Sequence, residues 1–405
     1  MEDYVQLDKQ FVVETYYHTF ESAVVDATDC WYILDNGQRI LNFTSAYSAQ
    51  NWGIKNQRFI DVLCEQARIL PLTSRAICNN VLPVFAKELC QLLGYEQLIP
   101  MNSGAEAVET AIKVARRWGV EVKGVPENRG EIIVFSNNFA GRTITLISFY
   151  SEDPSLEARR NFGPFTAGFK ICEFNSEKRF LEAVNQNTVA VLFEPIQGEG
   201  GINVIDQRFL QTMKKICNDN QILIIADEIQ CGLYRAGDLL ASYMFDLKPD
   251  LVILGKSLGG GLVPISVVVG CRSIFQPMKP GSHGSTFGGN PLAARVGLEV
   301  VRYLKSQGEE LKNRVLRLGD KVKEFLRGLN SSLITDVKGT GLMLGLELDC
   351  DTEEFIKNAF QNGILLGKTR HSKTVRLTPP LVVSEADLEI GLAIIEKTLN
   401  QMKFS

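Results

Sequence analysis

The stretch Ile222-Leu-Ile-Ile-Ala-Asp227-Glu-Ile-Gln230, followed by Leu251-Val-Ile-Leu-Gly-Lys256-Ser-Leu-Gly-Gly-Gly261, decides the fold class. In each part a short apolar run rich in branched residues leads to a charged side chain. Similar runs occur at 132–135, 189–193 and 265–269, and longer amphipathic stretches separate them. This alternation is typical of an α/β fold, in which helices cover both faces of a mostly parallel sheet.

Asp227 and Lys256 are expected at the ends of adjacent strands of this sheet. Such a pair suits pyridoxal 5'-phosphate (PLP), because the lysine forms a Schiff base with the aldehyde and the aspartate keeps the pyridine nitrogen protonated. Each residue alone has an ordinary explanation, since a lysine after a strand is usually solvated and an aspartate often caps a helix. The two together, with the phosphate motif described next, favour a catalytic role.

A candidate phosphate site lies at Ser103-Gly104-Ala105-Glu106. Ser103 and Glu106 have the spacing of a capping box at the start of an amphipathic helix, and 98–102 is strand-like. A capped helix is the simpler interpretation. The functional one is that the free N–H groups and the positive end of the helix dipole face a crevice at the sheet edge and bind a phosphate there.

Other polar residues are candidates for the same site. Ser285 and Thr286 lie in a Gly-rich stretch that is able to approach phosphate oxygens. Phe139 is able to stack on a pyridine ring and Arg142 to bind a carboxylate through two hydrogen bonds, although core packing and a surface ion pair are equal alternatives.

Two further carboxylates, Glu194 and Glu199, follow an apolar run that is typical of a buried strand. Carboxylates at a buried strand end need partners, so we expect both to have cationic ones. Arg376, in a strand-like segment far along the chain, is the best distant candidate.

Composition excludes several classes of function. The chain has 405 residues, of which 45% are hydrophobic and 22% charged, which is typical of a globular protein. Its net charge of −4 does not favour binding to the negatively charged backbone of a nucleic acid. No apolar run approaches the roughly 20 residues of a membrane helix, and the start is acidic, so we expect a cytoplasmic protein without membrane contact. The nine cysteines form no Cys-x-x-Cys pair, which disfavours disulfides and a metal site.

The pattern changes near residue 295. A long helical stretch over 293–329, a strand over 343–348 and a closing helix over 385–402 are typical of a smaller α+β lobe. We therefore predict an N-terminal segment on the side of the small domain (1–45), a large cofactor-binding domain (46–295) and a C-terminal small domain (296–405).

Taken together, the chain resembles the class III PLP-dependent aminotransferases of fold type I, and within them most closely the ornithine δ-aminotransferases, over nearly its whole length. The segments at 45–47 and 162–165 are the more particular to the ornithine group. The resemblance is carried by Ser45-Ala-Tyr47, Thr73-Ser-Arg-Ala76, Met101-Asn-Ser-Gly-Ala-Glu106, Asn138-Phe-Ala-Gly-Arg142, Phe162-Gly-Pro-Phe165, Glu194-Pro-Ile-Gln-Gly-Glu199, Ala226-Asp-Glu-Ile-Gln230, Leu254-Gly-Lys256, His283-Gly-Ser-Thr286 and Val375-Arg376-Leu-Thr-Pro-Pro380.

The resemblance implies the transfer of the δ-amino group of ornithine to 2-oxoglutarate by a ping-pong mechanism in a homodimer with shared active sites. Lys256 would be the Schiff-base lysine and proton carrier. The cofactor would be held by Ser103, Gly104, Ala105, Phe139, Asp227, Gln230 and Ser285, with Thr286 reaching the phosphate from the neighbouring subunit. Tyr47 and Arg142 would hold ornithine, while Arg376 would bind the α-carboxylate of the oxo acid and be released by Glu199 for the second half-reaction.

The chain departs from the family at two places. The family's His-Asn-Tyr appears as His18-Thr19-Phe20, which removes the phenol that would contact the α-amino group of ornithine, and a Gly-His-x-His-Pro loop appears as Gly53-Ile-Lys-Asn-Gln57. Another terminal-amine donor, such as acetylornithine, 4-aminobutyrate, lysine or a diamine, is therefore the main alternative. An aminomutase or racemase would not need the Arg376–Glu199 switch, and a non-enzymatic protein would not need Lys256 and Asp227.

Overall fold

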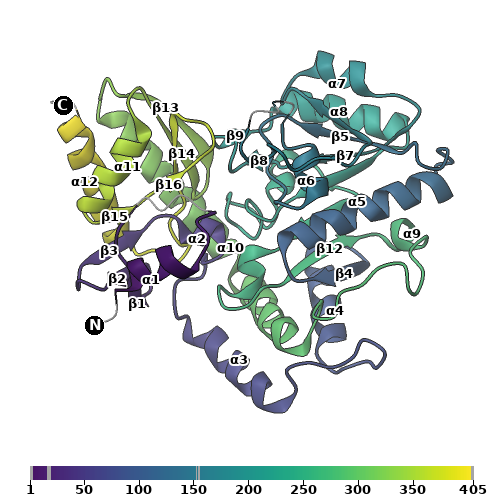
Figure 1. The fold of residues 1–405 in the computed structure, drawn as a ribbon, viewed down its shortest axis with the longest axis horizontal. Helices are drawn as coiled ribbons and strands as arrows, with labels where there is room; N and C mark the ends of the chain where they lie inside the picture. The colour runs from purple at the N-terminus through teal and green to yellow at the C-terminus, as the bar shows by residue number, and fades with distance from the viewer. Residues whose placement is uncertain (1–2, 16–19, 152, 154–155, 403–405) are drawn as a thin grey trace.

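The computed structural model describes residues 3–15, 20–151, 153 and 156–402. Its centre is a seven-stranded sheet in the order β4-β12-β11-β10-β7-β5-β6 (Figure 1). These strands are β4 (Gln97–Met101), β5 (Glu131–Phe135), β6 (Phe169–Cys172), β7 (Thr188–Phe193), β10 (Leu223–Asp227), β11 (Leu251–Leu254) and β12 (Ser266–Gly270). All pairs from β6 to β11 are parallel, whereas β12 is antiparallel to both neighbours, so the predicted mostly parallel sheet is confirmed.

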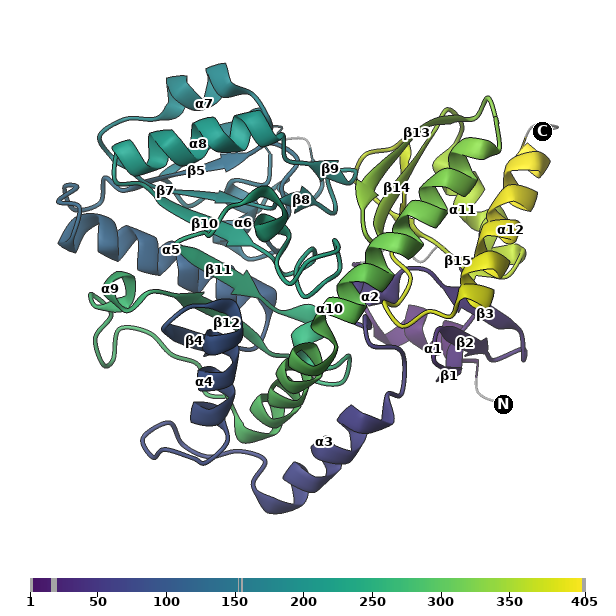
Figure 2. The same cartoon turned by 180° about the vertical axis from the view of Figure 1, so that it is seen from behind.

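Helices cover both faces of this sheet, as the strand alternation requires. Ile132 and Val134 of β5 pack in one cluster with α5 (Gly104–Glu121). Ile133 of β5 packs in another with α7 (Glu177–Ala183) and α8 (Gln207–Asp219), on the opposite side (Figure 2). Successive side chains of a strand point to opposite faces of the sheet, so a fully apolar strand needs helices on both faces to bury it.

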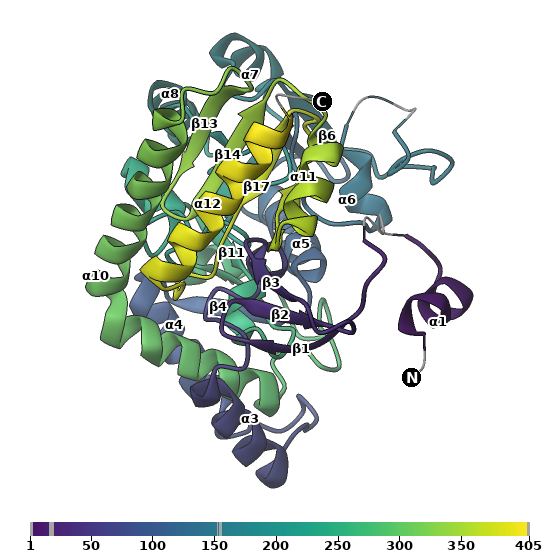
Figure 3. The ribbon, with the colours of Figure 1, turned by 90° about the vertical axis from the view of Figure 1, so that its left-hand side faces the viewer.

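A second lobe contains two four-stranded sheets (Figure 3). In one, the N-terminal strands pair in the order β1-β2-β3-β15, which joins the beginning of the chain to its C-terminal part; the other has the order β13-β14-β17-β16. The strands are β1 (Val24–Thr28), β2 (Trp31–Leu34), β3 (Arg39–Asn42), β13 (Ile334–Thr340), β14 (Met343–Leu348), β15 (Ile364–Leu365), β16 (Gly367–Lys368) and β17 (Thr374–Leu377).

The long helix α10 (Pro291–Gly328) runs from the large sheet into this lobe and contains the predicted boundary at residue 295. It starts at Asn290, whose side chain accepts a hydrogen bond of 2.8 Å from the N–H of Ala293. Where α10 passes the β13–β14 turn, a Cβ on Gly319 would lie 2.0 Å from the carbonyl oxygen of Gly341. Only glycine allows this approach, which holds the lobe against the helix.

Arg235 fastens the two lobes in a way that the sequence did not reveal. Its side chain is fully buried and donates to the carbonyl oxygens of Leu342 and Pro379, at 2.9 and 2.7 Å, and to the side chain of Asn51. Burial lowers the pKa of this guanidinium to about 9.

The remaining elements complete the described chain. They are α1 (Tyr4–Phe11), α2 (Ser45–Ser48), α3 (Gln57–Ile69), α4 (Leu82–Leu93), α6 (Ile144–Ser148), β8 (Ile196–Gln197), β9 (Asn203–Val204), η1 (Ala241–Phe245), η2 (Lys256–Gly259), α9 (Arg272–Phe275), α11 (Thr352–Gln361) and α12 (Glu385–Met402). The nine cysteines all lie within the described residues and form no disulfide there. Among the described residues, no helix has both the length and the apolar character needed to cross a membrane.

Candidate functional site

The site forms where β7, β10 and β11 end at one edge of the large sheet. Asp227 is the last residue of β10 and pairs in register with Ile253 of β11, and Lys256 follows that strand. Glu194 directly follows β7, the other neighbour of β10. Parallel pairing therefore brings two carboxylates and one amine to the same crevice, which is where ligands bind in open α/β sheets.

Asp227 is a buried carboxylate with few partners. It is 6% exposed and accepts a hydrogen bond of 3.0 Å from the N–H of Ile229. Burial raises its pKa to about 7, although the nearby amine of Lys256 acts in the opposite direction. A carboxylate in this position suits a cationic partner, such as a protonated ring nitrogen, which would restore its charge.

Lys256 is held in an uncommon backbone conformation, with a φ of 47° at the start of η2. Burial lowers the pKa of its amine, and the neighbouring Arg376 contributes in the same direction, while Glu199 opposes the shift. Non-glycine residues in the left-handed region carry strain that proteins often keep at functional sites. A lysine with a lowered pKa is more readily neutral and nucleophilic.

The start of α5 has the predicted capping box. The side chain of Ser103 accepts from the N–H of Glu106 at 3.2 Å, and the carboxylate of Glu106 accepts from the N–H of Ser103 at 2.6 Å. The N–H groups of Gly104 and Ala105 have no acceptor among the residues that the structure describes. They are available to a phosphate at the positive end of the helix.

Phe139 is fixed through its own backbone. Its N–H donates to Glu194 at 2.8 Å, and the N–H of Gly198 donates to the same carboxylate at 3.4 Å. Among the described residues Glu194 forms no ion pair; backbone N–H groups hold it, and the charge of Lys256 acts on it from nearby. Burial and the charge of Asp227 raise the pKa of Glu194 to about 8.

Gln230 lies beside these groups. Its amide nitrogen donates to the carbonyl oxygen of Tyr47 at 3.3 Å, and a Cβ on Gly198 would lie 1.3 Å from its amide oxygen. The glycine thus makes room for this side chain next to Asp227.

Tyr47 lies on a single left-handed turn, because Ser45 to Ser48 all have positive φ. The side chain of Asn42 accepts from the N–H of Ser45 at 3.1 Å, and the hydroxyl of Ser45 donates to the carbonyl of Thr378 at 2.6 Å, so the turn is held at both sides. The ring of Tyr47 lies 5.2 Å from the guanidinium carbon of Arg376.

Arg376, on β17, is fully buried and forms the predicted ion pair with Glu199. Its Nη1 donates to that carboxylate and to the carbonyl of Gly198 at 3.3 Å. Its Nε and Nη2 have no partner among the described residues. Two adjacent unpaired donors of a guanidinium match the two oxygens of a carboxylate.

The other predicted residues lie in different surroundings. Arg142 is exposed over the rings of Phe139 and Tyr150, with its guanidinium carbon 5.5 and 5.2 Å from their centres. Phe20 stacks on Phe360 of α11 at 3.8 Å between ring centres, while His18 and Thr19 lie outside the described residues. In the altered loop, Lys55 forms an ion pair with Asp26.

Ser285 and Thr286 differ in their surroundings. The hydroxyl of Ser285 accepts from the side chain of Asn102 at 2.9 Å, next to the start of α5 in its own chain. Thr286 is exposed, as is the ring of Phe287.

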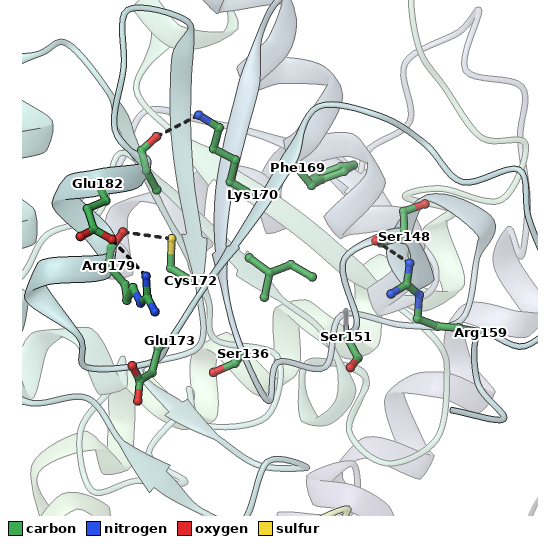
Figure 4. A pocket seen from close by; sticks show the side chains of 12 residues that line it. Ser136, Ser148, Ser151, Arg159, Phe169, Lys170, Cys172, Glu173, Arg179 and Glu182 are labelled. Carbon is green, nitrogen blue, oxygen red and sulfur yellow. Dashed lines mark hydrogen bonds and ion pairs between the residues drawn. The ribbon is translucent and has the colours of Figure 1, made fainter. Parts of the chain in front are cut away.

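A cavity of about 1060 Å³ lies elsewhere, beside the edge strand β6 (Figure 4). Two of its charged side chains already have partners, since Lys170 pairs with Glu131 and Arg179 with Glu182. It contains none of the strand-end residues described above. Its size does not give it a chemical role.

Comparison with known proteins decides the family. The model of the class-III aminotransferases matches residues 12–399. The chain belongs to the class-III aminotransferases. It is 42% identical to the ornithine aminotransferase of Brevibacillus brevis, over 95% of either protein.

Two solved structures of aminotransferases have the same fold. An ornithine aminotransferase from Toxoplasma gondii, with PLP partially occupying its active site, is 36% identical, has a TM-score of 0.94 and matches 99% of this chain and 94% of that one. The acetylornithine aminotransferase of Elizabethkingia anophelis is also 36% identical, with a TM-score of 0.87 and 98% of both chains matched. Class-III aminotransferases are PLP enzymes, and the residues at this sheet edge fit that cofactor.

The raised pKa of Asp227 predicts a pH-dependent stability in the cofactor-free protein. Its folded pKa of about 7 exceeds the ordinary value of 3.8, so its contribution to stability is complete below the ordinary value and is lost as pH rises through about 7. The free energy of unfolding of Asp227→Asn should therefore rise relative to that of wild type by about 1–4 kcal/mol as the pH increases from about 4 to about 8. Each unit of pKa difference corresponds to about 1.4 kcal/mol. Calorimetric melting temperatures measure this; parallel curves for the two proteins would contradict it.

Proposed function

We propose that this aminotransferase transfers the δ-amino group of ornithine to 2-oxoglutarate, giving glutamate semialdehyde and glutamate, with PLP as its cofactor. The observation that carries the proposal is the pair of unlike arginines at the site. Arg376 is buried and paired with Glu199, whereas Arg142 is exposed and stacked on aromatic rings. Two carboxylate sites of different character suit an enzyme that takes two different substrates in turn.

The residues around the crevice would hold PLP as follows. Asp227 would bond the ring nitrogen, Gln230 the ring hydroxyl, and Phe139 would stack on the ring. Gly104 and Ala105 would bind the phosphate through their N–H groups, next to Ser103. When bound, PLP supplies the electron sink that lets an amino group pass between two carbon skeletons.

Lys256 would link the cofactor covalently and move the proton during transfer. Its lowered pKa supports both roles, because the neutral amine is the form that attacks an aldehyde and accepts a proton. Burial of the same amine also keeps water from competing for the proton.

Glu199 would act as the switch between half-reactions. While it pairs with Arg376, ornithine would bind through Arg142 and Tyr47 and present its δ-amine. When the oxo acid arrives, Arg376 would exchange the Glu199 carboxylate for the substrate's α-carboxylate. The two unpaired donors on Arg376 support this exchange.

We also propose a homodimer with shared sites. Phe287, Ile77 and Val84 are exposed apolar side chains, and Gly289 packs close to Leu82 at the start of α4, so the two segments that carry them are neighbours. Exposed apolar groups gathered in this way are typical of a subunit interface. Thr286, on the same exposed segment, would reach the phosphate of the neighbouring subunit, with Ser285 beside it.

The cytoplasmic location stays a prediction from the sequence.

Acetylornithine is the second candidate donor. The solved acetylornithine aminotransferase is as identical to this chain as the ornithine enzyme from Toxoplasma gondii. Phe20 in place of the family tyrosine favours it too, because acetylation removes the α-amino charge that the phenol would contact.

Isotope transfer from ornithine tests the proposed reaction. With ¹⁵N only at the δ position and 2-oxoglutarate as acceptor, the glutamate formed should carry the label, whereas label at the α position should stay in the donor product. Mass spectrometry of the glutamate measures this. Labelled glutamate from α-labelled ornithine, or turnover with acetylornithine but not ornithine, would contradict the proposal.

Two substitutions test the switch. Glu199→Ala should leave Arg376 free, so that glutamate becomes the relatively better amino donor and the ornithine half-reaction weakens by about 3–5 kcal/mol at most, the scale for breaking a buried pair. Arg376→Ala should impair 2-oxoglutarate more than ornithine. Single-turnover absorbance of each cofactor form with each substrate separates the two effects.

Glu347→Ala is a matched control, because Glu347 also pairs with a basic residue, Lys338, and has the same 21% side-chain exposure as Glu199. It should leave the ratio of the two half-reactions unchanged. Equal losses in both half-reactions for both site variants would show that Arg376 and Glu199 form only a structural pair.

A further inference from the structure

We propose that Arg370 is a positioning residue that holds Arg142 through the ring of Tyr150 and thereby sets the preference for donors that carry a carboxylate. The inference rests on the proposed function, in which Arg142 binds the carboxylate of the amino donor. Arg370 lies on the loop between β16 and β17, in the small lobe, while Arg142 lies on the loop before α6 and Tyr150 just after that helix, both in the segment that follows β5.

The ring of Tyr150 is shared by two guanidinium groups. The guanidinium carbon of Arg370 lies 4.0 Å from the ring centre and that of Arg142 lies 5.2 Å from it. Phe139 completes the cluster, since its ring meets Tyr150 edge-on at 6.3 Å and also lies under Arg142 at 5.5 Å. Tyr150 is only 5% exposed, so its ring is a fixed platform.

Arg142 depends on this platform for its position. Among the residues that the structure describes, its guanidinium has no hydrogen bond or ion pair, and the two rings are its contacts. All of its N–H groups are therefore available to a carboxylate. A long, exposed side chain without such support would lose more conformational freedom on binding.

Arg370 is fastened at three points. Its Nη2 donates to the carbonyl of Asn138 at 3.0 Å, its Nη1 donates to the carbonyl of Tyr150 at 3.4 Å, and its backbone N–H donates to the carbonyl of Glu199 at 2.9 Å. It thus ties both ends of the segment that carries Phe139 and Arg142 to the residue that pairs with Arg376. One planar guanidinium makes the ring contact and both side-chain bonds, which a lysine cannot reproduce.

The charges point to the same role. Neither Arg370 nor Arg142 forms an ion pair with a carboxylate in the described part of the chain. Two cations on one ring, without a compensating anion, favour the arrival of a negatively charged group. A donor with a carboxylate gains from this field, whereas a plain diamine does not.

The test compares ornithine with putrescine, which has the same terminal amine and lacks the carboxylate. In the holoenzyme, Arg370→Ala should weaken the apparent affinity for ornithine about three- to thirtyfold, the range from an exposed to a desolvated cation–π contact, while putrescine changes less than about twofold. Arg142→Ala should have the same selectivity, and the double variant should be no weaker than Arg142→Ala alone. Single-turnover absorbance of the cofactor gives both affinities.

A binding measurement is independent of the donor. Pentanoate carries the carboxylate without an amine, so its inhibition constant should rise in Arg370→Ala by the same factor as for ornithine. If wild type does not react with ornithine, the proposed function fails, and pentanoate still tests Arg370.

Matched variants separate positioning from a general structural effect. Tyr150→Leu should reproduce Arg370→Ala, Tyr150→Phe should retain the preference for ornithine because it keeps the ring, and Arg370→Lys should lose it. Arg39→Ala removes the same kind of contact, 4.7 Å over Trp31 in the N-terminal sheet, and should behave as wild type. Equal losses for ornithine and putrescine, or no change in either ornithine or pentanoate affinity, would overturn the proposal.

Discussion

Parallel pairing of β7, β10 and β11 is the constraint on which the site depends. Because the strands run in the same direction and in register, Glu194, Asp227 and Lys256 all come to one edge of the sheet. Burying carboxylates is costly, and the structure meets part of that cost with the N–H groups of Ile229, Phe139 and Gly198. The raised pKa values of Asp227 and Glu194 record the part that remains until a cationic ligand binds.

Glu194 and Arg376 are both buried charged groups, but their hydrogen-bond partners differ. Glu194 receives backbone N–H groups and so fixes the loop that carries Phe139. Arg376 receives one carboxylate and one carbonyl, which leaves two donors unpaired in a fully buried position. Hydrogen bonds to backbone N–H groups make Glu194 a support for the loop, whereas the two unpaired donors of Arg376 match a carboxylate ligand. Glu194 therefore supports the structure of the site, whereas Arg376 is proposed to bind substrate.

Local patterns in the sequence predicted much of the fold and part of the site. The apolar runs gave β5, β7, β10 and β11, and the capping box gave the start of α5, because these signals depend on neighbouring residues. The antiparallel direction of β12 was not predicted, since strand direction depends on the path of the connecting chain. The Arg376–Glu199 pair was expected from the carboxylate that follows a buried strand, and the resemblance to a family added its role as a switch.

The contacts that the sequence did not predict join residues far apart along the chain. Arg235 binds acceptors more than a hundred residues away, and Arg370 meets Tyr150 across more than two hundred. Neither arginine has a local pattern that distinguishes it from a solvated one. The stacking of Phe20 on Phe360 was not predicted for the same reason, because the two residues are far apart in the sequence. Such contacts follow from packing between lobes and become visible only in three dimensions.

The amine of Lys256 is the group proposed to carry the cofactor at this sheet edge. Borohydride reduction of the purified protein, followed by peptide mass spectrometry, tests this role most directly. We expect a pyridoxyl group on the peptide that contains Lys256 and on no other lysine. Modification of a different lysine, or a reduced protein without a bound pyridoxyl group, would contradict it.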